Sequence, residues 1–362
     1  MVPSRRGRVI VVGSLNLDHT VTVERLPPPG ATVAGRSYST AAGGKGLNQA
    51  VAAARQGADV VMVGAVGDDP AGGLLAGVLA EESIDVEWLR RVPGPSGTAL
   101  VTVDAAGANT IVVVPGANGA LDVDDVPAQV VAGAAVVVCQ LEVRLAVVRA
   151  ALEVARRGGA FTILNPAPAP GPLPDGVLEL VDLVVPNEVE AAALVPLAGG
   201  RGPLDAAGAA GRALVGAGAG AALVTLGSRG ALLVGRGTAT PVGPLAVRPV
   251  DPTAAGDAFV GALAAALAAG DSMAAATRRA AAAGALATTR LGAVPSLPDR
   301  RSVDRALAAL DAGKGSTRFD PAGSRSRPSP AGTQSPGPRR PPPSGGPAGG
   351  PAGPTRPRGS RG

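Results

Sequence analysis

The residues with the clearest chemical potential lie late in the chain, where Asp251-Pro-Thr-Ala-Ala-Gly-Asp257 runs directly into an apolar, Ala-rich stretch. This order predicts a turn of small residues that delivers the Asp257 carboxylate to the first turn of a helix. Such a turn presents unpaired backbone N–H groups, and Ala254, Ala255 and Gly256 leave room for a phosphoryl group beside them. A carboxylate placed there suits proton removal from a hydroxyl during phosphoryl transfer to a small molecule. An acid in the first turn also stabilises any helix, so the stretch alone leaves both interpretations open.

Other polar groups follow predicted strands, where an open parallel sheet binds its ligands. Asn16 and Asp18 are two positions apart in an extended segment, so they face the same side and suit adjacent hydroxyls of a polyol. Lys45 and Asn48 share a helix face just after Gly43 and Gly44, and glycines there permit close approach of a ligand. Capped turns with solvated polar groups would give the same patterns.

Four further segments have the same placement at predicted strand ends. Glu142 follows one strand, and Asn165 follows the next. Pro186-Asn187-Glu188-Val-Glu190 opens a helix, where acids are favourable in any case, although Glu190 also suits water around a nucleotide-bound Mg²⁺. Thr225-Leu-Gly227-Ser228-Arg229-Gly230 predicts a tight turn that can cradle phosphates through backbone N–H groups.

The elements that must position these residues alternate along 1–311, which predicts a parallel sheet covered by helices on both faces. We expect strands at Val9–Val12, Val60–Val63, Ala134–Val138, Phe161–Leu164, Leu183–Val185 and Ala221–Thr225. We expect helices near 45–56, 71–82, 143–157, 188–194, 204–216, 256–269, 272–288 and 302–311. Two strand pairs interrupt this alternation and predict a small separate antiparallel sheet, a lid or an oligomer surface: Leu17–Val23 with Thr32–Tyr38, and Thr98–Val103 with Thr110–Val114.

Composition narrows the class of protein. A single cysteine, Cys139, excludes an internal disulfide and fits a reducing cytoplasm, while a single histidine, His19, excludes a His-based metal cluster. No apolar run reaches the length of a membrane span, so we expect no membrane association. The net charge of +5 comes from residues 312–362, which carry +8 and leave 1–311 at −3. This Pro-, Gly-, Ser- and Arg-rich tail is predicted to be disordered, and the absence of aromatics other than Phe319 for base stacking argues against nucleic-acid binding.

Taken together, these motifs closely resemble the ribokinase family of carbohydrate kinases, in register over residues 8–311. The two family motifs match Gly43–Asn48 and Thr253–Asp257, and Val12–Asp18, Leu164–Ala169 and Leu226–Gly230 also look like that family. The resemblance implies a three-layer α/β/α fold with a mostly parallel central sheet and a small β-sheet lid. It further implies ATP-dependent phosphorylation of D-ribose at the 5-hydroxyl, and a homodimer formed through the lid sheets.

The resemblance also implies roles for individual residues. Asp257 would be the general base, with Ala254, Ala255 and Gly256 forming the anion hole. The sugar would be bound by Asn16, Asp18, Gly44, Lys45, Asn48 and Glu142. ATP would be bound by Asn187, Thr225, Gly227, Ser228, Gly230, Ala255 and Gly256, with Mg²⁺ reached from Glu190 through water. K⁺ or a similar monovalent cation would be held by Asp251, Thr253, Ala287, Arg290, Gly292 and Ser296.

The sequence departs from the family pattern at two places, and it is compatible with other substrates and functions. Pro252 replaces a common Thr, and residues 279–285 lack the Asn or His that many relatives place near adenine, so nucleotide selectivity is undecided. The substrate could instead be 2-deoxyribose, another pentose, a hexose or a nucleoside. A non-catalytic sugar or nucleotide sensor is a further alternative, but the intact Asp257 and its neighbouring small residues speak against it.

Overall fold

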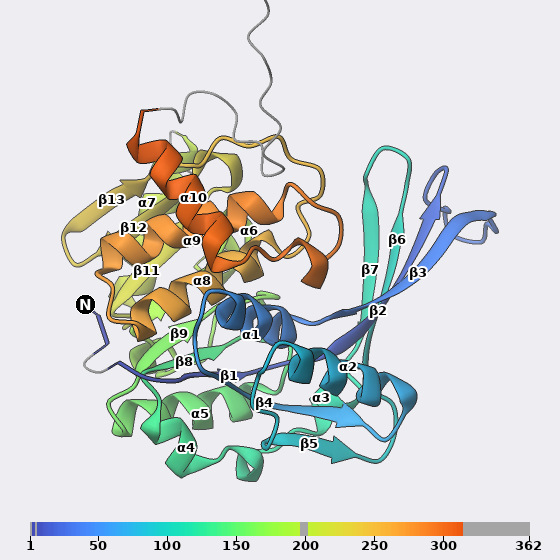
Figure 1. The fold of residues 1–362 in the computed structure, drawn as a ribbon, viewed down its shortest axis with the longest axis horizontal. Coiled ribbons are helices and arrows are strands. Elements are labelled where there is room, and N and C mark those ends of the chain that lie inside the picture. The colour runs from blue at the N-terminus through green and yellow to red at the C-terminus, as the bar shows by residue number, and fades with distance from the viewer. Residues whose placement is uncertain (1, 4–5, 196–201, 314–362) are drawn as a thin grey trace, which may run out of the picture. The chain divides into compact units, whose positions relative to one another are not determined.

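The central sheet forms from short β-branched runs that are buried on both faces. The computed structural model describes residues 2–3, 6–195 and 202–313, and within these the main sheet has nine strands in the order β13-β12-β11-β10-β9-β8-β1-β4-β5 (Figure 1). The six strands expected from the sequence are parallel neighbours in this sheet: β1 (Val9–Val12), β4 (Val60–Gly67), β8 (Val136–Cys139), β9 (Phe161–Leu164), β10 (Leu183–Val184) and β11 (Ala221–Thr225).

Three strands at the edges of the main sheet were not expected from the sequence. At one edge β5 (Leu89–Val92) pairs in parallel with β4. At the other edge β12 (Ala231–Gly235) and β13 (Thr238–Val242) form an antiparallel hairpin on β11. The sheet is therefore mostly parallel, as predicted, with an antiparallel extension at one side.

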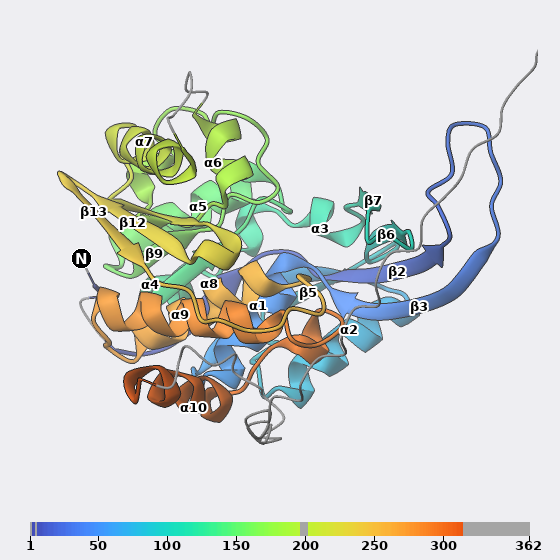
Figure 2. The ribbon, with the colours of Figure 1, turned by 90° about the horizontal axis from the view of Figure 1, so that it is seen from above.

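Helices cover both faces because alternate strand residues point to opposite sides. In β1, Val9 and Val11 join one core and Ile10 and Val12 the other. The first core is covered by α1 (Lys45–Arg55), α2 (Pro70–Glu81), α8 (Ala255–Ala268) and α9 (Met273–Ala287), with α10 (Arg300–Asp311) packed on α9 (Figure 2). The second is covered by α3 (Ala117–Ala120), α4 (Ala128–Gly133), α5 (Leu145–Arg157), α6 (Glu188–Leu194) and α7 (Pro203–Gly216).

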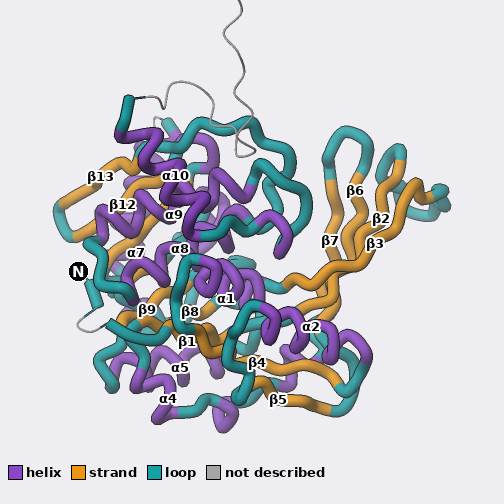
Figure 3. Tube along the Cα trace, viewed as in Figure 1, coloured by secondary structure: helices purple, strands orange, loops and turns teal. Residues whose placement is uncertain are grey.

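A second sheet projects from the three-layer core, in the order β3-β2-β6-β7 (Figure 3). Its strands are β2 (Asn16–Val23), β3 (Gly35–Gly43), β6 (Gly97–Val103) and β7 (Asn109–Val114). Each predicted pair is antiparallel, but the two pairs join through parallel β2 and β6, so the expectation of a wholly antiparallel sheet is wrong. The expected strand at Thr32–Tyr38 is also displaced: β3 starts at Gly35, after the Pro- and Gly-rich loop, and continues to Gly43.

No helix among the described residues is long and apolar enough to cross a membrane. The predicted disorder of the basic tail concerns residues that lie almost entirely outside the described part of the chain, from 314 onward.

Candidate active site

The start of α8 brings a carboxylate and a cluster of backbone amides together, as the sequence predicts. Ala254 is the N-cap and has left-handed backbone geometry, with a φ of 57° that a non-glycine residue seldom adopts. The Ala255 N–H donates to the Pro252 carbonyl at 3.2 Å. Gly256 and Asp257 follow in the first turn, where N–H groups have no intrahelical acceptor. The strained turn therefore presents amides to an anion next to the Asp257 side chain.

Asp257 is buried, with 7% of its surface exposed, and two side-chain amides hold its carboxylate. The Asn48 Nδ2 donates to Oδ2 at 3.0 Å, and the Gln49 Nε2 donates to Oδ1 at 2.9 Å. Burial raises the pKa of Asp257, while Lys45 and the two amides oppose that shift. An ionisable carboxylate with a raised pKa, oriented by amides, is equipped to accept a proton from a hydroxyl.

Lys45 lies among acidic side chains at the start of α1. Burial alone would lower the pKa of Lys45, but Asp257, Glu142 and Glu190 together raise it above its ordinary value. The Lys45 backbone N–H also donates to the Glu142 Oε2 at 2.9 Å. The same oxygen accepts the Ser14 hydroxyl at 2.5 Å, so Glu142 is fixed by two segments at once.

The β2 residues meet α1 where two glycines permit close contact. A Cβ at Gly44, which has a φ of 90°, would lie 2.8 Å from the Asn16 backbone nitrogen, and one at Gly43 would lie 2.2 Å from the Asp18 carboxylate. Asn16 is buried and accepts a bond from the Asn118 Nδ2 at 2.8 Å. Desolvation, followed by the charges of Glu142 and Asp257, raises the pKa of Asp18 to about 7. The predicted sugar-binding residues therefore converge on the ends of β2 and α1.

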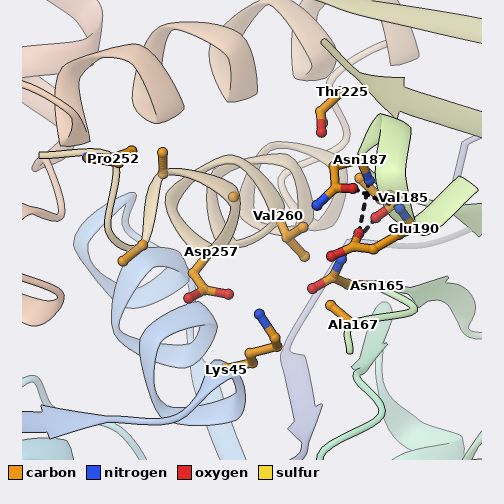
Figure 4. A pocket seen from close by; sticks show the side chains of 13 residues that line it. Lys45, Asn165, Ala167, Val185, Asn187, Glu190, Thr225, Pro252, Asp257 and Val260 are labelled. Carbon is orange, nitrogen blue, oxygen red and sulfur yellow. Dashed lines mark hydrogen bonds between the residues drawn. The ribbon is translucent and has the colours of Figure 1, made fainter. Parts of the chain in front are cut away.

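A cavity of about 230 Å³ lies over the start of α8. Figure 4 shows Lys45 extending toward the space between Asp257 and Glu190. Asn187 caps α6: its Oδ1 accepts the Glu190 N–H at 2.8 Å, and the Glu190 Oε2 accepts the Asn187 N–H at 2.8 Å. Burial raises the pKa of Glu190. The lining further includes Asn165, Ala167, Val185, Thr225, Pro252, Ala254, Ala255, Gly256 and Val260.

A second, larger cavity of about 450 Å³ shares part of this lining. Thr225, Pro252, Ala255 and Gly256 line both cavities, so the helix start separates two adjoining spaces. Its remaining wall is mostly apolar and comes from the turn after β11, from residues 244–249, from α8 and from α9 with the residue that follows it: Gly227, Ser228, Gly230, Pro244, Leu245, Ala246, Val247, Pro249, Phe259, Ala281, Gly284, Ala285 and Thr288. The predicted nucleotide-binding residues Thr225, Gly227, Ser228 and Gly230 thus lie on one wall.

The predicted cation residues lie around the loops that precede α8 and follow α9. Asp251 Oδ1 accepts the N–H and the hydroxyl of Thr253, and its Oδ2 accepts the Gly292 N–H at 2.8 Å. Arg290 donates its N–H to the Ala287 carbonyl, and the buried Ser296 hydroxyl donates to the Ala293 carbonyl. Burial would raise the pKa of Asp251, but the three hydrogen bonds that it accepts from Thr253 and Gly292 outweigh burial and lower it. The charged, oxygen-only donor set fits a hard monovalent cation.

Four polar residues at the site were not identified as site residues from the sequence. Gln49 bridges Asp257 and Asn165, and Gln140 bonds Gln49 in turn. Asn118 bonds both Leu15 and Asn16, and Ser14 bonds Glu142. Gln49 carried a usable signal, because it is four residues after Lys45 and shares its helix face. Asn118 sits in a short helix outside the strand-end pattern and carried none.

The similarity of this chain to known proteins agrees with the small-molecule kinase that the site geometry indicates. The family model described as pfkB family carbohydrate kinase matches residues 6–300. The chain therefore belongs to the pfkB family of carbohydrate kinases.

Individual relatives narrow the comparison. The ribokinase of Haemophilus influenzae is 36% identical over 302 residues, covering 82% of this chain and 97% of that protein. The deoxyribokinase of Salmonella typhi is 34% identical over 262 residues, covering 71% and 84%. Among solved structures, Arabidopsis thaliana ribokinase complexed with ribose and ATP superposes with a TM-score of 0.77 at 32% identity, covering 85% of this chain and 99% of that one.

Proposed function

We propose that this protein is an ATP-dependent kinase that phosphorylates D-ribose at its 5-hydroxyl. The observation that carries the proposal is the Asp257 carboxylate, which is buried beside Lys45 at the first turn of α8, where two adjoining cavities meet. The smaller cavity is lined by Lys45 and Asp257 and, on its other side, by Asn187, Glu190 and Thr225. The larger cavity is lined by Thr225, Gly227, Ser228 and Gly230, which are expected to bind the nucleotide. The 36% identity to a ribokinase over 97% of its length supports ribose as the substrate.

In the proposed reaction the sugar hydroxyl gives its proton to Asp257. The hydroxyl oxygen forms a bond to the γ-phosphorus as the bond from that phosphorus to the bridging oxygen breaks, and ADP leaves with the bridging electron pair. The backbone amides of Ala254 and Gly256 would point toward the charge on the transferred group, joined by that of Ala255 once it leaves the Pro252 carbonyl, and the Lys45 cation would add to this stabilisation. Positioning and electrostatics therefore account for the catalysis.

The sugar would be held by side chains from three segments around Asp257. Asn16 and Asp18 on β2, Asn48 on α1 and Glu142 after β8 offer carboxylates and amides to hydroxyls, with Lys45 beside them. Gly44 contributes by allowing α1 to approach β2 closely. Because the carboxylates accept and the amides both donate and accept, several hydroxyls of a pentose can be bound at once.

The nucleotide would occupy the larger cavity, with its base against the apolar wall and its phosphates toward Gly256. Thr225, Gly227, Ser228 and Gly230 line this cavity, and Asn187 lines the adjoining smaller one, into which the phosphates would extend. Mg²⁺ bound with ATP would neutralise phosphate charge, and Glu190 would face it through water. Burial raises the pKa of Glu190, and a cation bound nearby would oppose this shift and favour the ionised form.

A monovalent cation, K⁺ by preference, would bind beside the anion hole through Asp251, Thr253, Ala287, Arg290, Gly292 and Ser296, mostly by backbone carbonyls. When bound it would supply positive charge that orients the turn before α8. The Asp251 carboxylate accepts three hydrogen bonds and retains capacity for a further ligand.

We further propose a cytoplasmic homodimer joined through the lid sheets. The cross-strand neighbours Leu100 and Val112 are 48% and 60% exposed, which is unusual for apolar side chains of a sheet. Light scattering should give twice the mass of one chain, with or without residues 312–362. Val112→Lys should yield monomers, whereas Leu74→Lys, on the exposed surface of α2, should leave the mass unchanged.

The reaction is tested by a coupled ADP-release assay over D-ribose, 2-deoxyribose, other pentoses and hexoses, with and without K⁺. We expect the highest kcat/KM with D-ribose. Asp257→Asn should lower kcat by about 10²- to 10⁴-fold while the protein still binds ribose. Turnover like that of the wild type in this variant would refute Asp257 as the base, and a preference for another sugar would refute the substrate.

A further inference from the structure

The buried Gln49 side chain connects Asp257 to two other polar residues. Its Nε2 donates to the Asp257 Oδ1 at 2.9 Å and to the Asn165 Oδ1 at 3.0 Å. Its Oε1 accepts from the Gln140 Nε2 at 2.7 Å. Gln49 and Gln140 are both fully buried. Both amide protons of Gln49 and one lone pair of its oxygen are therefore used within the protein, and its full burial keeps it from a ligand.

Gln140 determines which end of the Gln49 amide meets Asp257. If the Gln49 amide were rotated by 180°, its oxygen would face the Asp257 carboxylate oxygen and the Asn165 amide oxygen, which both repel it. Its nitrogen would then face the Gln140 nitrogen, which is also a donor. Gln140 is itself confined, since a Cβ at Gly13 would lie 1.9 Å from its Oε1. That Oε1 has no hydrogen-bond partner within the described part of the chain. The Gln140 side chain therefore contributes its N–H group to Gln49, while its own buried oxygen accepts no hydrogen bond from the described residues, which is energetically unfavourable.

Resting on the proposed function, we propose that Gln49, oriented by Gln140, is a positioning residue that fixes the Asp257 carboxylate for proton transfer. Gln49 donates to Oδ1 and Asn48 donates to Oδ2, so each oxygen of the carboxylate is held by one amide of α1. A carboxylate has about four lone-pair directions, so these two bonds stop its rotation and leave the remaining directions for the substrate hydroxyl. The Asn48 Oδ1 has no hydrogen-bond partner among the described residues and could accept a sugar hydroxyl. Gln49 is fully buried and both of its N–H groups are bonded within the protein, so its effect on the reaction passes through Asp257.

The ionised form of Asp257 is also favoured by this donor. The other charged groups that act on or face Asp257 come from separate elements: Lys45 on α1, Asp18 on β2, Glu142 after β8 and Glu190 on α6. A substitution at Gln49 removes none of them. A change in the pKa of Asp257 in such a variant therefore reports the lost hydrogen bond.

The experiment measures the pKa of Asp257 by ¹³C NMR of aspartate carboxyls, with Asp257→Asn used to assign the signal. In Gln49→Leu we expect the pKa of Asp257 to rise by about one unit, because the ionised form loses a donor. The acid limb of kcat/KM for ribose should move to higher pH by the same amount. The kcat should fall by about tenfold to a hundredfold, while KM for ATP stays at its wild-type value.

Gln56→Leu is the matched control. Gln56 is a buried glutamine of the turn that ends α1, and its Nε2 donates to the Pro298 carbonyl, remote from Asp257. This variant should lose stability but keep the wild-type pKa of Asp257 and pH profile. Gln140→Leu should shift both in the same direction as Gln49→Leu, and it carries the test if Gln49→Leu does not fold.

An unchanged pKa of Asp257 in folded Gln49→Leu and Gln140→Leu would overturn the proposal, as would an equal shift in Gln56→Leu. Failure of the proposed function is a separate result: the wild type would then phosphorylate no sugar of the panel. The NMR titration needs no turnover, so it still decides whether Gln49 acts on Asp257.

Discussion

Gly261→Ala is expected to disable the enzyme without touching any side chain of the site. Gly261 lies in α8 where that helix crosses α1. A Cβ added there would come within 2.4 Å of the Ala52 Cβ, 2.6 Å of the Gln49 carbonyl oxygen and 2.8 Å of the Ala53 nitrogen. Two of these atoms are backbone, so no side-chain rotation relieves the contact.

The expected magnitude follows from these distances. Ordinary contact begins near 3.4 Å, so α1 and α8 must separate by about 1 Å at this crossing. The bonds from Asn48 and Gln49 to Asp257, at 3.0 and 2.9 Å, would then approach 4 Å and cease to be hydrogen bonds. We expect kcat to fall by about a hundredfold. Overpacking should cost about 1–3 kcal/mol of stability, reduced by up to about 1 kcal/mol because alanine favours a helix over glycine.

Coupled ADP-release kinetics and guanidinium unfolding measure the two effects. Gly77→Ala is the matched control, because Gly77 lies inside α2 and an added Cβ there meets nothing within 4 Å. That variant should gain about 0.5–1 kcal/mol and keep full activity. Wild-type turnover and stability in Gly261→Ala would refute the reasoning that the α1–α8 spacing holds the site.

Three further changes have definite expected outcomes. Arg55→Met should lower the free energy of unfolding by about 2–4 kcal/mol, because it leaves the half-buried Glu82 carboxylate without its ion-pair partner. Guanidinium unfolding with equal midpoints for the variant and the wild type would contradict this. The raised pKa of Asp18 means that the folded state holds a proton which the unfolded state releases, so stability falls as pH rises from about 4 to 7, by at most about 1.4 kcal/mol per pH unit. Asp18→Asn should flatten this slope in unfolding measured across that range, and an unaltered slope would refute the assignment. Gly284→Val should place its Cβ 3.0 Å from the Ala255 carbonyl oxygen and its methyl groups near Phe259, in the wall of the larger cavity. We expect KM for ATP to rise more than KM for ribose, and the opposite pattern would contradict nucleotide binding in that cavity.

The sequence predicts the central part of the fold well because periodicity is a local signal. Runs such as Val9–Val12 and Phe161–Leu164 are continuous and apolar, as strands buried on both faces must be. The β12–β13 hairpin escaped prediction because its short runs follow a parallel unit and are separated only by Arg236 and Gly237. The start of β3 was misplaced because a strand boundary after a Pro- and Gly-rich loop depends on its pairing with β2, which is a tertiary property.

The site shows the same division between local and distant information. The site roles of Asp257 and Lys45 can be predicted because the small residues immediately before each of them indicate the start of a helix. The link from Gln49 to Asp257 joins positions 208 residues apart, and that from Asn118 to Asn16 joins positions 102 apart. Amides that hold a site together across such separations carry no local motif, and the packing of α1 against α8 decides whether they meet.

The placement of the sugar residues on β2 has a consequence for how such an enzyme changes its substrate. Asn16 and Asp18 belong to the sheet that projects from the core, whereas Asp257 and the amides of 254–256 belong to α8. Substitutions in β2 can therefore change which sugar is recognised, while the groups that move the phosphoryl unit stay in place on a different element. Selection for a new sugar can vary this strand and keep the phosphoryl-transfer groups of α8, so libraries for directed evolution are best begun in β2.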